Sequence, residues 1–159
     1  MVDWTEPGLR GCLLAVRNEV TGVDYSMRVL GFRGYNSALF KRGLELVWLH
    51  RQLSRRDGAH FLALEDAFIY GVNPDRQALV LLFERAETSL LEVGLYRREA
   101  QWPWREQQLT RIMRDAVAAC ARLKELRMMV RDLRVGNWVF VPQRMRYVLA
   151  DLSSGRECP

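Results

Sequence analysis

The stretch VRDLRVGNWVF, residues 130–140, carries the most informative pattern in this sequence. It is basic, yet it contains one acid, Asp132, and an amide five positions later, Asn137. An apolar run typical of a buried strand follows directly. Asp and Asn are common turn formers, so these two residues alone predict no more than a turn. The neighbouring sequence is needed to tell whether Asp132 and Asn137 form only a turn or belong to a functional site.

The segment before this stretch predicts a long helix. Residues 105–129, REQQLTRIMRDAVAACARLKELRMM, place apolar side chains on one face at helical spacing. These side chains are Leu109, Ile112, Met113, Ala116, Val117, Cys120, Leu123 and Leu126. The segment after the stretch predicts a hairpin, with strands NWVFV and YVLAD on either side of the turn PQRM. The second of these strands ends on Asp151.

The first half of the chain predicts an antiparallel sheet with one helix. CLLAVRN and DYSMRVLGF have the character of strands around the turn EVTG, where Gly22 supplies the permissive backbone position. Residues 36–53 predict a helix with Asn36 or Ser37 as its N-cap. Its apolar positions at helical spacing are Leu39, Phe40, Leu44, Val47 and Trp48. FLALEDAFIYG and QALVLLFE predict two more strands, joined by GVNPD. The expected fold class is α+β.

The order of these features resembles the catalytic core of a eukaryotic protein kinase. A long helix is followed by Arg131-Asp132-Leu133, then by Asn137, the short hairpin and Asp151. That family's signature is H-R-D-L-x-x-x-N followed by D-F-G, and this chain reads V-R-D-L-R-V-G-N and later D-L-S. Phosphoryl transfer needs an acceptor for the proton of the attacking hydroxyl and hard oxygen ligands for Mg²⁺. The resemblance implies that Asp132 is the catalytic base and that Asn137 and Asp151 hold the metal.

The resemblance continues upstream. VRNEVTGVDYSMRVL is similar to the second and third strands of the kinase small lobe, with Arg28 in the place of the phosphate-pairing lysine. Glu45 matches the helix glutamate that pairs with that lysine. EPGLRGCL resembles the glycine-rich loop, with Gly8 and Gly11 as its second and third glycines and Leu13 as its valine. These matches imply a nucleotide-binding small lobe.

The segment LVLLFERAET resembles the strand and hinge between the two kinase lobes. The resemblance implies that Phe83 guards the back of the adenine pocket and that backbone groups from Glu84 to Ala86 face adenine. It also implies a division at this point. Residues 1–86 would form a kinase-like small lobe with its antiparallel sheet and one helix. Residues 87–159 would form the truncated, helical beginning of the large lobe, with the catalytic-loop and metal-loop equivalents.

Several residues depart from the kinase pattern. Arg28 keeps the positive charge, but its planar guanidinium is bulkier than an ammonium group and forks differently. Glu6 places a carboxylate where the loop backbone should approach phosphate, which is repulsive. Ser153 replaces the glycine after the metal-binding Asp. The sequence ends at Pro159, before any activation segment, which is expected either of a fragment of a longer kinase or of a naturally truncated, degenerate one.

Composition limits the class of protein. Hydrophobic residues at 49% and charged residues at 27% are ordinary for a soluble globular protein, and no apolar run is long enough to span a membrane. The N-terminus carries acids where a signal peptide needs a basic and apolar run. Cys12, Cys120 and Cys158 form no disulfide framework or metal spacing. We therefore expect an intracellular protein, cytoplasmic or nuclear, that is not secreted. The net charge of +5 comes mostly from arginine and favours a solvated surface over a nucleic-acid surface.

The expected function is that of a pseudokinase, a catalytically impaired kinase-like domain that acts as a binding or structural module in a larger assembly. ATP and Mg²⁺ are expected to bind weakly. The helix from Glu106 to Met128 keeps an apolar face for a protein partner. One alternative is a fragment of an active ATP-dependent Ser/Thr kinase, which the retained Asp132, Asn137 and Asp151 favour. Another is a basic architectural subunit that contacts nucleic acid, which the arginine excess alone favours.

Overall fold

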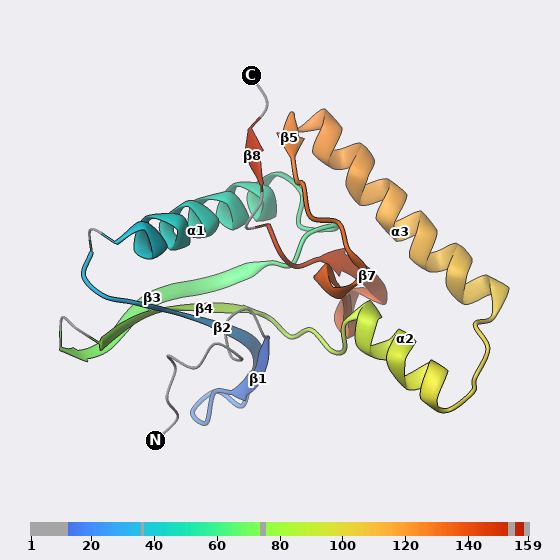
Figure 1. Ribbon diagram of the computed structural model, residues 1–159, viewed down its shortest axis with the longest axis horizontal. Helices are drawn as coiled ribbons and strands as arrows, with labels where there is room; N and C mark the ends of the chain where they lie inside the picture. Colours follow the sequence, from blue (N-terminus) through green and yellow to red (C-terminus); the bar gives the residue numbers. More distant parts are fainter. Residues whose placement is uncertain (1–12, 36, 74–75, 153–154, 158–159) are drawn as a thin grey trace. The chain divides into compact units, whose positions relative to one another are not determined.

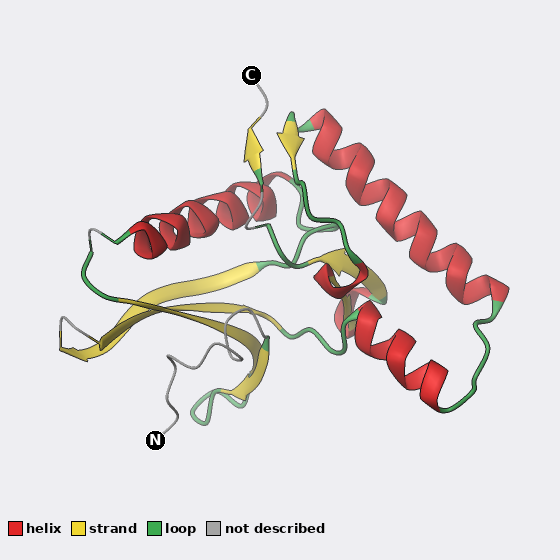
Figure 2. Cartoon of the chain, in the orientation of Figure 1, coloured by secondary structure: helices red, strands yellow, loops and turns green. Residues whose placement is uncertain are grey.

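The computed structural model describes residues 13–35, 37–73, 76–152 and 155–157 (Figures 1 and 2). The chain divides into two compact units. Unit 1 consists of Met1–Gln52 and Ala63–Arg85, and unit 2 of Leu53–Leu62 and Ala86–Pro159. Unit 1 holds a four-stranded antiparallel sheet and most of one helix, and unit 2 holds two helices with two small two-stranded sheets. The expected α+β class is therefore confirmed.

The sheet of unit 1 consists of two hairpins. The strands β1 (Leu14–Arg17), β2 (Asp24–Phe32), β3 (Leu64–Asn73) and β4 (Arg76–Glu84) lie in the order β1-β2-β4-β3, and each pair is antiparallel. Both hairpins agree with the sequence expectation. Gly22 lies in the first turn with a φ of 71°, a backbone conformation that favours glycine.

The helix α1 (Ala38–Arg56) begins at the expected cap, because the backbone N–H of Phe40 donates to Ser37 Oγ at 3.2 Å. Its buried face differs from the expected one. Phe40, Leu46, Leu49 and Leu53 are buried, whereas the apolar residues Leu39, Leu44 and Trp48 are about half exposed. Helical spacing identifies a set of apolar positions but does not tell which of two adjacent stripes meets the sheet.

The helix α1 lies close against one face of the sheet in unit 1 (Figure 1). Gly43 stands at the contact: a Cβ there would lie 2.7 Å from Leu79 Cδ2 on β4 and 3.6 Å from Leu30 Cδ1 on β2. Glycine costs about 1 kcal/mol relative to alanine inside a helix. The close approach to buried Leu79 is the physical reason for accepting that cost.

Unit 2 contains the helices α2 (Leu90–Glu99) and α3 (Glu106–Glu125). Its strands are β5 (Met128–Met129), β6 (Trp138–Val141), β7 (Arg146–Leu149) and β8 (Arg156–Glu157), of which β5 pairs with β8 and β6 with β7. Ser89 begins α2 with a capping box to Glu92. The helix α3 is tied to β7, because the backbone N–H of Tyr147 donates to Asp115 Oδ2 at 3.0 Å.

The expected end of the long helix needs correction. The long helix does not continue to Met128 or Met129: it ends at Glu125, with Leu126 as C-cap and Arg127 at a φ of 54°. A left-handed residue stops the helical hydrogen bonding, and Met128 then belongs to β5. The two units alternate along the chain, because Leu53–Leu62 belongs to unit 2 and Ala63–Arg85 to unit 1. Among the described residues, we find no helix that is both long and apolar enough to span a membrane.

Candidate functional site

The loop that the sequence singled out is held by its own side chains. After α3 and β5, residues 130–134 lead into a 3₁₀ turn, Val135–Asn137, and then into β6. Asn137 is buried, and its Nδ2 donates to the backbone oxygen of Asp132 at 3.1 Å. Trp138 Nε1 donates to the backbone oxygen of Leu133 at 3.1 Å. Two side chains at the start of β6 therefore fix the backbone on which Asp132 sits.

The β6–β7 hairpin brings Asn137 and Asp151 to the same end. Trp138 pairs with Leu149, and the backbone N–H of Ala150 donates to the Asn137 oxygen at 2.8 Å. Asp151 is the next residue along the chain. The Asn137 amide nitrogen makes the bond to Asp132, so that bond does not use the amide oxygen. Mg²⁺ is commonly held by one or two protein oxygens together with substrate phosphates and waters. Asn137 and Asp151 fit such a site by their chemistry.

The carboxylate of Asp132 has a basic neighbour. Arg134 Nη2 lies 3.0 Å from Asp132 Oδ2, and the backbone N–H of Arg134 lies 3.4 Å from Asp132 Oδ1. The Asp132 side chain is 37% exposed, so solvent and ligands reach it. An attacking hydroxyl would have to share this carboxylate with the Arg134 guanidinium. A substrate hydroxyl can therefore reach the Asp132 carboxylate, but the Arg134 guanidinium already occupies part of it.

The predicted pair in unit 1 has one buried and one exposed member. Arg28 lies on β2 opposite Leu81 and is 6% exposed. Glu45 lies on α1 with an exposed side chain, next to the buried Leu46. Phe83 on β4 is fully buried, and its ring meets His50 of α1 edge-on with the centroids 4.9 Å apart. His50 thus holds the sheet-facing position beside Phe83, and an ion pair between Arg28 and Glu45 stays a prediction.

The remaining predicted residues belong to the glycine-rich loop and the hinge. Gly8 and Gly11, like Glu6 and Ser153, lie outside the described residues, and Leu13 is half-buried just before β1. At the end of β4, the Glu84 N–H donates to the Ala63 oxygen at 3.0 Å, and Glu84 Oε1 accepts from the Ala63 N–H at 2.7 Å. That backbone donor is therefore engaged within unit 1. Ala86, the first residue of the second stretch of unit 2, is buried.

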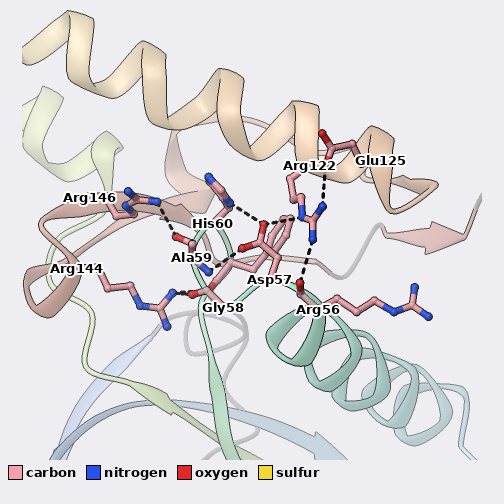
Figure 3. Close-up of polar contacts among 10 residues, drawn as sticks. Arg56, Asp57, Gly58, Ala59, His60, Arg122, Glu125, Arg144 and Arg146 are labelled. Carbon is pink, nitrogen blue, oxygen red and sulfur yellow. Dashed lines mark hydrogen bonds and ion pairs between the residues drawn. The ribbon is translucent and has the colours of Figure 1, made fainter.

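A polar cluster in unit 2 was missed by the sequence analysis. Asp57, just after α1, is 10% exposed, and its Oδ2 lies 2.7 Å from His60 Nδ1 and 3.1 Å from Arg122 Nε on α3 (Figure 3). Arg122 also contacts Glu125 Oε2 at 2.6 Å and donates to the backbone oxygen of Arg56 at 3.1 Å. The cluster joins segments that are 65 residues apart in sequence.

Two arginines of the β6–β7 hairpin, one in its turn and one at the start of β7, complete this cluster. Arg144 donates to the backbone oxygen of Gly58, and Arg146 donates to that of Ala59 at 3.4 Å (Figure 3). The loop after α1 therefore exposes few unsatisfied carbonyls, although it lacks regular structure. The sequence held one local signal, since Asp57-Gly58 is a turn dipeptide with His60 three positions after the Asp.

The electrostatics of Asp57 follow from this arrangement. Burial works to raise the pKa of Asp57, but the hydrogen bonds from His60 and the Ala59 N–H outweigh it, together with the positive charges of His60 and Arg122. The net result is a pKa below the ordinary value of 3.8. A carboxylate kept ionised by its neighbours acts as a structural anchor.

The apolar face of α3 is open. Leu109, Met113 and Val117 are 45%, 61% and 62% exposed, and Cys120 is exposed as well. We call these four residues the α3 stripe; at spacings of three and four residues they lie on one side of the helix. Ala119 and Leu123, on the inner side, are buried. The predicted partner-binding face thus divides into a packed part and an exposed part.

A scan of family models and a search of curated proteins found no match for this chain. Within the part of the chain that the structure describes, no three His, Cys, Asp or Glu side chains gather into a metal-binding group. Asn137 and Asp151 form a smaller set that would need phosphate oxygens and waters as further ligands.

Proposed function

We propose that this chain is a protein-kinase-like domain that works as a binding module and has impaired phosphotransfer. One observation carries the proposal: Asn137 braces the backbone of Asp132, while the β6–β7 hairpin sets Asp151 beside Asn137. Phosphoryl transfer requires a proton acceptor and oxygen ligands for Mg²⁺. The residues at this end of the hairpin are candidates for both roles.

Three features support impairment. Arg134 is paired with the Asp132 carboxylate and competes with a substrate hydroxyl for it. Arg28 has a planar guanidinium where the family has an ammonium group, and it is buried. The Glu84 N–H, expected to face adenine, already donates to Ala63. ATP and Mg²⁺ therefore bind weakly in this proposal.

The α3 stripe supports the binding role. Contiguous exposed apolar surface of a few hundred Å² is unusual on a monomer and marks interaction sites. A protein partner in a larger assembly would cover Leu109, Met113 and Val117. An intracellular location, cytoplasmic or nuclear, belongs to the same proposal, because Cys120 is an exposed free thiol of the kind that reducing compartments preserve.

The expected result of a phosphotransfer assay is negative. Incubated with radiolabelled ATP, Mg²⁺ and generic Ser/Thr substrates, the chain should transfer no more label than the matched variant Asp132→Asn. Asparagine keeps the shape of Asp132 but cannot take the hydroxyl proton, so the variant defines the background. Turnover of about 1–100 s⁻¹, which is typical of kinases, and its loss in Asp132→Asn would overturn the proposal.

An active kinase is the second candidate, and one observation favours it. Asp132, Asn137 and Asp151 are all retained and are brought to the same end of the hairpin. The assay above separates the two candidates. If transfer is found, Arg134→Ala should increase it by releasing the Asp132 carboxylate.

A further inference from the structure

Unit 2 has a groove that neither the candidate site nor the α3 stripe uses. It has a volume of about 540 Å³ and is lined by α2, the segment leading into α3, the first half of α3 and the β6–β7 hairpin. Three arginines line it, Arg97, Arg111 and Arg114, against one carboxylate, Glu87. The groove therefore has an excess of positive charge.

Aromatic side chains form part of the groove wall and contact their neighbours within unit 2. The Arg97 guanidinium carbon lies 4.6 Å from the centre of the Trp104 ring, and Arg97 Nη1 donates to the Pro103 oxygen at 3.0 Å. Phe140 and Tyr147 face each other across the β6–β7 hairpin with ring centroids 5.4 Å apart. These contacts give the groove an apolar floor beside its charges.

No ion pair between described residues neutralises the three arginines of the groove. Arg111 and Arg114 are exposed, and within the described residues neither forms an ion pair. Arg97 contacts a carbonyl oxygen and an aromatic ring, neither of which cancels its charge. Nearby Asp115 accepts from the Tyr147 N–H. A ligand that brings carboxylates would be complementary to this surface.

We propose that this groove binds an acidic segment of a partner protein, with carboxylates on the arginines and one apolar side chain on the aromatic floor. A nucleic acid fits less well, because phosphate binding gains from a long run of cations. The groove has three arginines and a facing carboxylate, Glu87. One face of the Trp104 ring is covered by Arg97, which removes it as a platform for base stacking.

The groove and the α3 stripe meet at one border of the helix. Arg111 is two residues from both Leu109 and Met113, which places it about 160° away from each around the helix axis. Arg114 is three residues from Val117 and therefore lies beside the stripe. The inference rests on the proposed function in one respect, that the chain works by binding protein. It makes no use of Asp132, Asn137 or Asp151.

The test is a fluorescence anisotropy titration with a labelled acidic peptide, GEDELEEFG, at about 50 mM salt, where charge pairing is little screened. The protein is the full chain, fused to a solubility partner. We expect saturable binding that weakens about tenfold or more in Arg111→Glu/Arg114→Glu. Glu87→Gln should bind as tightly as the wild type or more tightly, because it removes the one facing carboxylate.

A matched control distinguishes binding at this groove from general attraction between a basic protein and an acidic peptide. Lys41→Glu/Arg42→Glu changes the net charge equally on exposed positions of α1 and should leave binding within about twofold. If the double reversal melts the fold, Arg111→Gln/Arg114→Gln replaces it. Equal loss in both double reversals would overturn the proposal, as would tighter binding of labelled oligo(dT) than of the peptide. Asp132→Asn should bind the peptide normally, so failure here and failure of the kinase-like proposal are distinguishable.

Discussion

Replacing Asp57 by alanine is expected to lower the free energy of unfolding by about 3 kcal/mol. The carboxylate is 10% exposed and accepts from the Ala59 N–H while pairing with His60 and Arg122. Removing it leaves these donors without their shared acceptor and releases α3 from the loop after α1. Urea denaturation followed by tryptophan fluorescence measures the change.

The matched control for this prediction is Asp24→Ala. Asp24 is also a carboxylate near an arginine, but its side chain is 52% exposed and the contact with Arg17 is 3.9 Å long. Such a pair contributes little, so this variant should stay within about 0.5 kcal/mol of the wild type. Equal losses in the two variants would mean that the Asp57 cluster is no anchor.

The Asp57 carboxylate also makes the stability of the folded chain depend on pH in the acid range. The pKa of Asp57 in the folded chain lies below its ordinary value, so the ionised form is stabilised by folding. That contribution is fully present above the unfolded pKa and is lost as the pH falls through the folded one. Below about pH 5 the wild type should lose stability faster than Asp57→Asn. Parallel stability curves for the two proteins would contradict this account.

The second large effect concerns the α3 stripe. The isolated chain is expected to self-associate or precipitate, whereas Met113→Glu/Val117→Glu should be monomeric. About 400 Å² of apolar surface left in water forgoes roughly 10 kcal/mol of burial, which is comparable with the stability of a domain. Charges at two of the most exposed stripe positions make that burial unfavourable. Light scattering distinguishes the self-associated chain from the monomer, and a thermal melt shows whether each variant unfolds cooperatively.

A pair of substitutions away from α3 controls for added charge. Val20→Glu/Val23→Glu introduces the same charges at two exposed apolar positions between β1 and β2 and should leave the self-association unchanged. If the wild-type chain is a monodisperse monomer with a sharp, cooperative transition, the stripe needs no partner. The binding role proposed for this helix would then fall.

The order of helices and strands could be predicted because it is local. Alternating apolar residues gave both hairpins of unit 1, and Ser37 marked the start of α1. The buried face of α1 was harder to predict: Leu44 and Trp48 are apolar yet exposed. Burial depends on what packs against the helix, and the local pattern does not contain that information.

In the candidate site, too, local features could be predicted from the sequence and contacts between distant segments could not. The β6–β7 hairpin brings Asn137 close to Ala150, the neighbour of Asp151, and Asn137 binds the backbone of Asp132. The roles of these three residues stay predictions. The Asp57–Arg122 contact could not be read from the sequence, since its members are far apart in the chain and each alone resembles a solvated charge. Glu45 shows the converse, a residue chosen by motif whose side chain is exposed.

Calorimetric titration of the chain with ATP and Mg²⁺ tests the central claim most directly. The soluble variant Met113→Glu/Val117→Glu serves as the protein, with Asp151→Asn added as its control. We expect weak binding, with a Kd above roughly 100 μM, or a binding free energy of at most about 5.5 kcal/mol, that disappears in Asp151→Asn. Low-micromolar binding that strengthens with Mg²⁺ would contradict weak nucleotide binding, and its loss in Asp151→Asn would favour the active-kinase alternative.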